Sequence, residues 1–399
     1  MAASAVLKKG EGRTVKKGGL WIYDNEIARI EGTYTNGEII GVRDFDGFFM
    51  GWGYINDHSR IRIRLLSRRE DIPVTDDLLR QRVRDCLAYR KDVIDMSSCR
   101  LVFGEADYLP GLTVDKFSDV LVVECLTLGM DLMKEKIMAF LREELALMGM
   151  PIRGIYERSD AKVRELEGLS RFKGFMGPEF DTQVLIEENG VKYYVDVKDG
   201  QKTGFFLDQK LNRRAVAGLC RGKKVLDCFT HTGSFGLNAA KGGAASVLAV
   251  DASDTGIAQA EKNAVLNNLQ DIIRFQVADV FELLPALEAE GQLYDVVVLD
   301  PPAFTKSRNS IKNAVKGYRE INLRGMRLVK NGGYLATCSC SHFMDPELFA
   351  KTIREAANGA HKTLRQVYFS TQAPDHPIAW NADESYYLKF YIFQVLDRC

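Results

Sequence analysis

The sequence predicts an α/β protein that begins with a small all-β module and ends in a Rossmann-like, doubly wound and mostly parallel sheet. In the second half of the chain, apolar runs of strand length alternate with helical segments, as in parallel β–α–β units. Within residues 1–72, short strands are separated by Asn36-Gly37 and Asp46-Gly47, dipeptides that favour tight hairpins because their central residues need positive φ. Residues 73–188 mix both kinds of element, which indicates a central α+β domain.

The predicted domains are therefore residues 1–72, 73–188 and 189–399. A linker over 71–76 ends in a helix N-cap, and the helix that follows is expected to reach residue 95. A second amphipathic helix is expected over 131–148, and a hairpin over 184–197. The predicted strands of the parallel sheet are residues 224–228, 246–251, 273–278, 296–300 and 334–338.

The composition is typical of a globular cytoplasmic protein. The chain has 399 residues, of which 46% are hydrophobic and 27% charged, with no net charge, as in an ordinary globular protein of two or three domains. The sequence contains no long apolar run and no secretory signal, so we expect a cytoplasmic protein that does not contact a membrane. Eight cysteines without zinc-type spacing predict reduced thiols and no metal site.

Basic side chains gather at both ends of the first domain. With zero net charge, any contact with RNA must use such local patches. Residues 61–65 alternate with period two, which predicts a strand with one apolar and one cationic face. Arg60 and Arg62 are therefore predicted to contact phosphates, and the alternative is a solvated strand face. The basic residues of this domain include Lys8, Lys9, Arg13, Lys16, Lys17, Arg60, Arg62, Arg64, Arg68 and Arg69.

Residues 225–236 are typical of a nucleotide-binding turn, with an apolar strand, a glycine-containing turn and a helix start. Gly233 would let the backbone approach a ligand closely. The turn lacks the first two glycines of the Gly-x-Gly-x-x-Gly pattern, and Asp227 places negative charge where a pyrophosphate would lie. A carboxylate there suits a cationic ligand with an amino group, such as S-adenosylmethionine, better than it suits NAD.

Two more acids follow the next two predicted strands. Asp251 ends the second strand, where an acid can accept hydrogen bonds from both ribose hydroxyls. Asp279 follows the third strand, where it could accept a hydrogen bond from an adenine amino group. Helix N-capping is an alternative for each acid separately, but it explains the set of three less well.

The fourth predicted strand ends in Asp300-Pro301-Pro302. Proline fixes φ and holds the preceding residue extended, so Asp300 is presented rigidly at the strand end. Such a motif resembles that of methyltransferases acting on the planar edge of a base. Asp300 would grip the polar edge of the ring, beside Pro301 and Pro302, and Phe304 could stack on it.

Cys338 and Cys340 lie two residues apart on the last of these strands and so face the same way. Only Cys340 would emerge at the carboxyl end of the strand, where open α/β sheets bind ligands. A thiolate there could add to carbon 6 of cytosine and make carbon 5 nucleophilic towards a methyl sulfonium. The alternative is that both cysteines are small buried apolar residues.

The cytosine reaction would use Cys340 as the nucleophile and Asp300 to hold or protonate the N3 edge of the ring. A base must then remove the carbon 5 proton, and the sequence does not identify it. Since an ordinary thiol has a pKa of about 8.5, a neighbouring donor or cation should lower it. His342 and Lys306 are the candidates.

These residues closely resemble the bacterial large-subunit ribosomal RNA methyltransferase I family, which makes 5-methylcytosine in 23S RNA. The resemblance spans nearly the whole chain and includes a PUA-like RNA-binding domain at residues 18–23 and 56–64. The most specific matches are residues 201–209, the cofactor signature at 226–233 and Ser339-Cys340-Ser341.

The resemblance implies a class I methyltransferase domain that binds S-adenosylmethionine and acts on 23S ribosomal RNA. Through the matched motifs it adds Gln209, Thr232 and Gly233 to the cofactor residues, carries the nucleophile onto Cys340 and makes Cys338 structural. Two positions depart from the pattern. Ala303 stands where many RNA 5-methylcytosine enzymes have a second cysteine used in product release, and His342 stands where the family often has glycine.

Other functions remain open from the sequence. An N-methyltransferase acting on an exocyclic amine of an RNA base would use residues 300–304 and need no thiol. A non-catalytic RNA-binding or ribosome-assembly factor with a vestigial cofactor site is a second alternative. A nicotinamide dehydrogenase is disfavoured because the glycine triplet is missing. The target nucleotide, the use of free RNA or an assembly intermediate, and the formation of a homodimer stay open.

Overall fold

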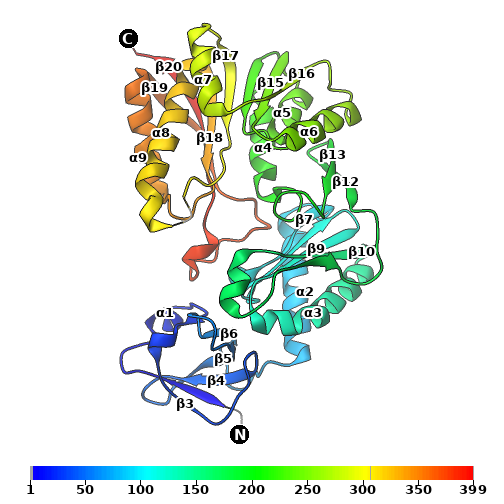
Figure 1. Ribbon diagram of the computed structural model, residues 1–399, viewed down its shortest axis with the longest axis vertical. Coiled ribbons are helices and arrows are strands. Elements are labelled where there is room, and N and C mark those ends of the chain that lie inside the picture. The colour runs from blue at the N-terminus through cyan, green and yellow to red at the C-terminus, as the bar shows by residue number, and fades with distance from the viewer. Residues whose placement is uncertain (1–2, 306, 399) are drawn as a thin grey trace. The chain divides into compact units, whose positions relative to one another are not determined.

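The computed structural model describes residues 3–305 and 307–398 (Figure 1). The chain forms two compact units. The first consists of Met1–Ile186, Val195–Leu207 and Pro374–Ser385, and the second of Glu187–Tyr194, Asp208–Ala373 and Tyr386–Cys399. None of the helices within the described residues is long and apolar enough to cross a membrane. The first unit holds two separate sheets, and its limits coincide with neither predicted domain boundary. The boundaries at residues 72 and 188 therefore stay a prediction.

The first unit begins with a six-stranded sheet in the order β2-β6-β5-β4-β1-β3. Its core is formed by residues such as Leu7, Ile22, Val42 and Leu65, which are almost fully buried. The predicted all-β module is therefore confirmed. Its elements are β1 (Ser4–Leu7), α1 (Arg13–Lys16), β2 (Trp21–Ile22), β3 (Ile27–Glu31), β4 (Ile39–Arg43), β5 (Phe49–Ile55) and β6 (Ile63–Ser67).

The predicted cationic face of residues 61–65 is wrong at Arg64. All five residues of β6 are buried, because both faces of the strand are covered: Ile63 and Leu65 lie in the core of this sheet, and Leu66 lies in the core of the central domain. The guanidinium of Arg64 forms a buried ion pair with Glu167, at 2.9 Å between Nη2 and Oε1. Arg62 is partly exposed and pairs with Asp57, and Arg60 is exposed. The side chains still alternate between the two faces of the strand, but the cationic face is buried instead of solvated, and the ion pair lets Arg64 lie there.

The second sheet of the first unit has five strands in the order β11-β10-β9-β8-β7, and helices α2 and α3 share its core. The Thr75 side chain caps α2 by accepting a hydrogen bond from the N–H of Leu78 at 3.3 Å. The central α+β architecture is thus confirmed. Its elements are α2 (Asp76–Val93), β7 (Ser98–Phe103), β8 (Leu112–Phe117), β9 (Val120–Cys125), α3 (Leu128–Leu147), β10 (Gly154–Ser159) and β11 (Phe172–Phe175).

The second unit contains a seven-stranded sheet in the order β16-β15-β14-β17-β18-β20-β19. The first five strands run parallel, and β20 pairs antiparallel with both β18 and β19. The predicted doubly wound sheet is confirmed. Its strands are β14 (Lys224–Cys228), β15 (Ser246–Asp251), β16 (Ile273–Val277), β17 (Tyr294–Leu299), β18 (Val329–Ser339), β19 (Lys362–Ser370) and β20 (Lys389–Asp397).

Two groups of helices pack along this sheet (Figure 1). Helix α5 contacts α4 and α6, and helix α8 contacts α7 and α9. Because strands and helices alternate along the chain, each strand of the parallel part ends in a loop that leads to a helix. The helices are α4 (Lys210–Ala217), α5 (Ser234–Lys241), α6 (Asp254–Leu266), α7 (Val280–Ala289), α8 (Ile311–Leu328) and α9 (Pro346–Ala360).

A buried ion pair ties the predicted hairpin to the start of this unit. The hairpin consists of β12 (Gln183–Glu188) and β13 (Val191–Asp196). Glu188 at its turn accepts two hydrogen bonds from the guanidinium of Arg213 in α4, at 2.7 and 3.2 Å. Both side chains are only 1% exposed. The pair anchors α4, which leads directly into β14 and the loop after it.

We expect Glu188→Leu to lower the free energy of unfolding by about 3–5 kcal/mol, because it leaves the Arg213 guanidinium buried without its carboxylate. The double variant Glu188→Leu/Arg213→Met should recover most of that loss. The measurement is urea unfolding followed by circular dichroism. Glu320→Leu, which removes the exposed partner of Arg324, is the matched control and should cost at most about 1 kcal/mol. Equal losses in the two single variants would contradict this prediction.

Candidate active site

The register of the parallel strands brings the predicted site residues to one edge of the sheet. Cys228 in β14 lies opposite Val250 of β15 and Leu299 of β17, and Leu299 lies opposite Thr337 of β18. The carboxyl ends of parallel strands meet at the same edge, where open α/β sheets bind ligands. This register places four predicted site residues at that edge, because each lies at the end of its strand or just beyond it. They are Asp227, Asp251, Asp300 and Cys340.

The loop after β14 is held in a strained conformation. Phe229, His231 and Gly233 have φ angles of 64°, 56° and 87°, although the first two are not glycine. Left-handed backbone at such residues costs on the order of 1 kcal/mol each and persists only where the surroundings impose it. Here Asp251 accepts a hydrogen bond from the N–H of His231 at 2.9 Å. Thr232 lies at the tip of the same loop, next to Gly233, as predicted for cofactor-contacting residues.

Asp227 is completely buried at the end of β14. Its Oδ2 accepts hydrogen bonds from the Thr230 hydroxyl and from the N–H of Gly236, the latter at 2.7 Å. Its Oδ1 has no hydrogen-bond partner among the described residues. Burial raises the pKa of this carboxyl to about 7, against the two hydrogen bonds, with the carboxylates of Asp300 and Asp251 adding to the rise. A buried carboxylate oxygen without a donor fits the ammonium group of S-adenosylmethionine.

Asp251 and Asp279 occupy the ends of the neighbouring strands in different ways. The two oxygens of Asp251 accept the N–H groups of His231 and Ser253, each at 2.9 Å. Each oxygen keeps a second lone pair that a ribose hydroxyl could use. Asp279 is exposed and caps α7 by accepting the N–H of Phe281 at 2.8 Å. Asp279 is therefore a helix N-cap, which was the alternative for this residue. A contact between Asp279 and adenine stays a prediction.

Asp300 receives two side-chain hydrogen bonds on one oxygen. Gln209 Nε2 donates to Oδ1 at 3.0 Å, and the Cys338 thiol donates to the same atom at 2.8 Å. Asn212 orients the Gln209 amide by donating to its oxygen at 2.6 Å. Burial raises the pKa of Asp300 to about 6, and the two donors oppose this rise by favouring the carboxylate. Gln209, predicted to bind the cofactor, thus holds Asp300 in place.

Cys338 in β18 and Cys340 just beyond it differ in burial, as predicted. Cys338 is fully buried, and burial beside the Asp300 carboxylate raises the pKa of its thiol well above the ordinary value. The Cys338 thiol therefore stays protonated and donates to Asp300. The predicted structural role of Cys338 thus includes a hydrogen bond in addition to packing. Cys340 follows the last residue of β18 and is the one partly exposed cysteine among those described. Its Sγ lies 3.9 Å from the carbonyl oxygen of Pro301.

The loop after β17 is packed against the segment that carries Cys340. Pro301 is buried and Pro302 is exposed. The Phe304 ring lies 4.6 Å from the Tyr318 ring between centroids, so part of its surface is already covered. The Ser341 hydroxyl donates to the carbonyl oxygen of Thr305 at 2.8 Å, which fastens the two loops together. Lys306, a predicted substrate contact and thiol activator, lies outside the described residues.

Lys389 is a site residue that the sequence motifs did not reveal. It begins β20 and pairs with Ser339 in the antiparallel register with β18. Its ammonium is buried and donates to the carbonyl oxygens of Ser341, at 2.7 Å, and Tyr387, at 2.9 Å. His342, the other predicted activator of the thiol, is exposed, and its Nδ1 lies 3.4 Å from the Tyr386 carbonyl oxygen. No local motif marks Lys389, because only strand pairing brings it beside Cys340.

Comparison with known proteins decides the family. Residues 161–385 match the model of S-adenosylmethionine-dependent methyltransferases, and residues 5–68 match a PUA-like domain. The chain is 38% identical over 401 residues to Ribosomal RNA large subunit methyltransferase I of Shewanella denitrificans, across 99% of this chain and 100% of the relative. The protein of that name from Pseudoalteromonas translucida is also 38% identical, with the same coverage. The chain belongs to the ribosomal RNA large subunit methyltransferase I family.

Solved structures show the same fold. A methyltransferase structure complexed with S-adenosylhomocysteine superimposes with a TM-score of 0.82, at 21% identity, across 98% of this chain and 99% of the other. A methyltransferase from Streptococcus mutans gives a TM-score of 0.80, also at 21% identity and with the same coverage. The family resemblance predicted from the motifs is therefore confirmed, and the cofactor of this methyltransferase is S-adenosylmethionine. Which side chains hold the cofactor remains a prediction.

We expect the affinity for S-adenosylmethionine to rise with pH through the pKa of Asp227. Below about pH 7 the buried carboxyl is protonated and offers no charge to the ligand ammonium, and above it the carboxylate forms. Between pH 6 and 7.5 the affinity should increase on the order of 5- to 10-fold. Titration calorimetry checks this.

Two variants separate the Asp227 effect from general pH effects. Asp227→Asn should bind more weakly and without this pH dependence, whereas Asp271→Asn, which changes an exposed carboxylate, should behave like the unaltered protein. If Asp227→Asn kept the full pH dependence, Asp227 would not be the titrating group.

Proposed function

We propose that the protein methylates carbon 5 of a cytosine in 23S ribosomal RNA, through a transient bond between Cys340 Sγ and carbon 6 of the ring. The observation that carries this proposal is the position of Cys340, an accessible thiol at the end of β18, beside the Asp300-Pro301 loop. The names of the relatives, Ribosomal RNA large subunit methyltransferase I, support the RNA as substrate. A family member with a thiol in this place has the nucleophile that the cytosine reaction requires.

The proposed reaction divides the work between two side chains. The thiolate of Cys340 adds to carbon 6, and carbon 5 then has the nucleophilic character of an enamine. S-adenosylmethionine supplies the methyl group as a sulfonium. Loss of the carbon 5 proton to a base and elimination of the thiolate restore the aromatic ring and free Cys340. No side chain is assigned as that base.

Asp300 is proposed to hold the N3 edge of the cytosine. With a pKa of about 6, it can be present as acid or carboxylate near neutral pH. The acid can donate to N3 when carbon 6 is attacked, and the carboxylate can accept from the exocyclic amine. The donors Gln209 and Cys338 both use Oδ1, which orients the carboxyl group for this task.

For the cofactor, Asp227 is proposed to bind the ammonium group and Asp251 the ribose hydroxyls. The orphaned Oδ1 of Asp227 supports the first assignment. Thr232 and Gly233, in the strained loop, are proposed to approach the methionine portion with their backbone. Asp279 is proposed to accept from the adenine amino group. These residues bind and orient the cofactor next to the Asp300 loop.

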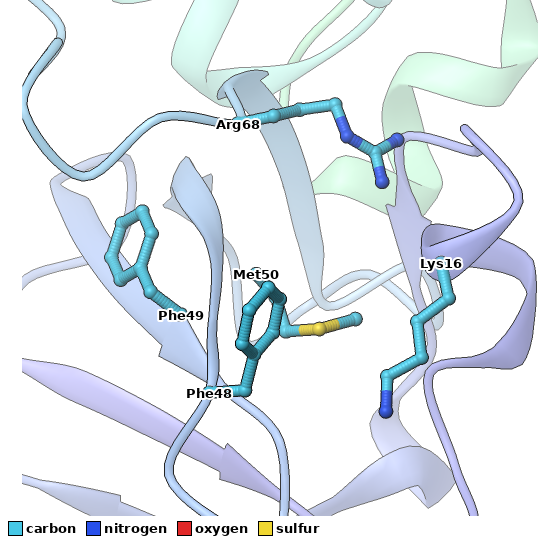
Figure 2. Close-up of a pocket in the computed structure, with 5 residues that line it drawn as sticks. All are labelled: Lys16, Phe48, Phe49, Met50 and Arg68. Atoms are coloured by element: carbon cyan, nitrogen blue, oxygen red, sulfur yellow. The ribbon is translucent and has the colours of Figure 1, made fainter.

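The first domain offers two basic surfaces for the RNA, at opposite ends of β6. Arg60 and Arg62 precede the strand, and Arg68 follows it. Beside Arg68 lies a cavity of about 530 Å³ lined by Lys16, Phe48, Phe49, Met50 and Arg68. Figure 2 shows the Lys16 side chain across this cavity from Phe48 and Met50. A cavity with aromatic and cationic walls suits a stacked, single-stranded base and its phosphate.

Phe48 is 67% exposed, yet its turn is rigid. Asp44 Oδ1 accepts hydrogen bonds from the N–H groups of Asp46, at 3.0 Å, and Phe48, at 2.9 Å. Asp44 Oδ2 accepts from the Lys16 ammonium at 2.7 Å. The backbone that carries the exposed ring is therefore held in place before any ligand binds, and less ordering entropy of the turn is lost on binding. We propose this cavity as an RNA contact in addition to Arg60 and Arg62.

A second candidate function is N-methylation of an exocyclic amine in the RNA. The observation that favours it is that the Asp300 carboxyl is organised by Gln209 and Cys338, and not by Cys340. An amine could be gripped by Asp300 and methylated with no thiol. Covalent trapping separates the two reactions, because only the cysteine mechanism leaves a stable adduct with a 5-fluorocytosine substrate.

We expect Cys340→Ala to abolish methyl transfer to 23S RNA while binding S-adenosylmethionine with nearly unchanged affinity. The unaltered protein should form a covalent adduct with RNA that contains 5-fluorocytosine, visible as a shifted band on a denaturing gel. Cys220→Ala, which removes a buried thiol three residues beyond the end of α4, should keep both activities. A fully active Cys340→Ala enzyme would exclude the covalent mechanism.

We expect Phe48→Ala to weaken the binding of a 23S RNA fragment by roughly 5- to 150-fold, the range for loss of one stacked base. Phe45→Ala is the matched control, since Phe45 is 52% exposed on the same turn but does not line the cavity. Filter binding at fixed salt measures both, with S-adenosylmethionine affinity as a check on folding. Equal affinities in the two variants would remove the cavity from the proposed RNA surface.

A further inference from the structure

Lys389 is a buried lysine whose hydrogen-bond acceptors are uncharged. The residue is 1% exposed, and its ammonium donates to two backbone carbonyl oxygens, of Ser341 and Tyr387. Removing an ammonium from water costs several kcal/mol unless an opposite charge compensates for it. Carbonyl oxygens satisfy the donors but do not neutralise the charge. An anion near Lys389 would therefore stabilise its buried ammonium.

The strand pairing fixes where that charge lies. Lys389 is opposite Ser339 in the β18–β20 register, and its ammonium binds the carbonyl oxygen of Ser341 at 2.7 Å. The backbone of Lys389 is thus aligned with the residue before Cys340, and its ammonium is bonded to the residue after Cys340. The acidic groups whose anionic forms would favour the ammonium of Lys389 are Cys340 first, then Cys338 and Asp345.

Among the described residues, Cys338, Asp345, Tyr318 and Tyr387 around this segment have hydrogen-bond partners other than Lys389. The Cys338 thiol donates to Asp300, so Cys338 does not become the anion. Asp345 is exposed and caps α9 by accepting the N–H of Leu348 at 2.8 Å. The hydroxyl of Tyr318 accepts from Ser339, and the hydroxyl of Tyr387 donates to Asp208 at 2.7 Å. Cys340 is therefore the group whose ionisation Lys389 would favour most.

We propose that Lys389 is a positioning residue that stabilises the thiolate of Cys340. The inference deepens the proposed function and rests on it for the role of that thiolate, but not for its existence. The proton of Cys340 leaves to solvent, and Lys389 remains an ammonium ion throughout. The same charge would favour the return of the thiolate when the bond to carbon 6 breaks. Lys389 would thus have the activating role predicted for His342, which is exposed, and the prediction for Lys306 lies outside the described residues.

The effect has a defined pH window. Burial lowers the pKa of Lys389 to about 8, and negative charge on the Cys340 sulfur opposes that shift. Lys389 is charged below this value and loses its proton above it. Stabilisation of the thiolate is therefore present at neutral pH and disappears as the pH rises through about 8.

Alkylation of the full-length protein with iodoacetamide, a neutral reagent, measures the Cys340 thiolate without any methyl transfer. The rate at Cys340 is followed by mass spectrometry of its peptide between pH 5.5 and 9.5. We expect Lys389→Met to lower that rate about tenfold at pH 7 and to move the profile towards higher pH, since one pKa unit is a factor of ten. Lys389→Arg should restore most of the rate, and Lys351→Met, at an exposed position of α9, should leave it unchanged.

Circular dichroism and thermal unfolding verify that each variant is folded. If Lys389→Met does not fold, Lys389→Gln gives the same readout, because it can donate to a carbonyl oxygen but carries no charge. A folded, uncharged variant with the unaltered alkylation profile would overturn the proposal. An active Cys340→Ala enzyme would instead overturn the cysteine mechanism and leave the alkylation result intact, so the two failures are distinguishable.

Discussion

The parallel register of β15, β14, β17 and β18 is the constraint on which the site depends. Pairing of Cys228 with Val250 and Leu299, and of Leu299 with Thr337, ends these strands at one edge. A slip of one residue in any pair would turn the side chains of that strand to the opposite face. The acids, the Asp300-Pro301 loop and Cys340 therefore share one place because the backbone hydrogen bonds allow one alignment.

Desolvation at this edge brings groups of very different intrinsic acidity into one pH range. Burial raises the pKa of Asp227 to about 7 and that of Asp300 to about 6, and it lowers the pKa of Lys389 to about 8. Such convergence near neutral pH is typical of catalytic sites. The buried pair of Glu188 and Arg213 shows the contrasting case, in which two opposite charges compensate each other and serve to hold α4.

Most of the architecture was predictable because it follows from local patterns. The alternation of apolar runs and helical segments predicted the parallel sheet, and turn dipeptides predicted the first domain. The prediction failed at Arg64, where an inward cation is paired with Glu167 from a distant segment. It was incomplete at Cys338, whose thiol donates to Asp300. In both cases the deciding partner lies far along the chain, where periodicity carries no information.

The sequence by itself determined the acids and the thiol that end the strands, since strand length, proline and glycine chemistry locate those ends without any tertiary contact. Only the tertiary structure decided how these groups are held and charged. The antiparallel pairing of β18 with β20 places Lys389 beside Cys340, and the start of α4 places Gln209 on Asp300. These contacts depend on long-range pairing and on burial, which set electrostatic energies and which no local pattern encodes.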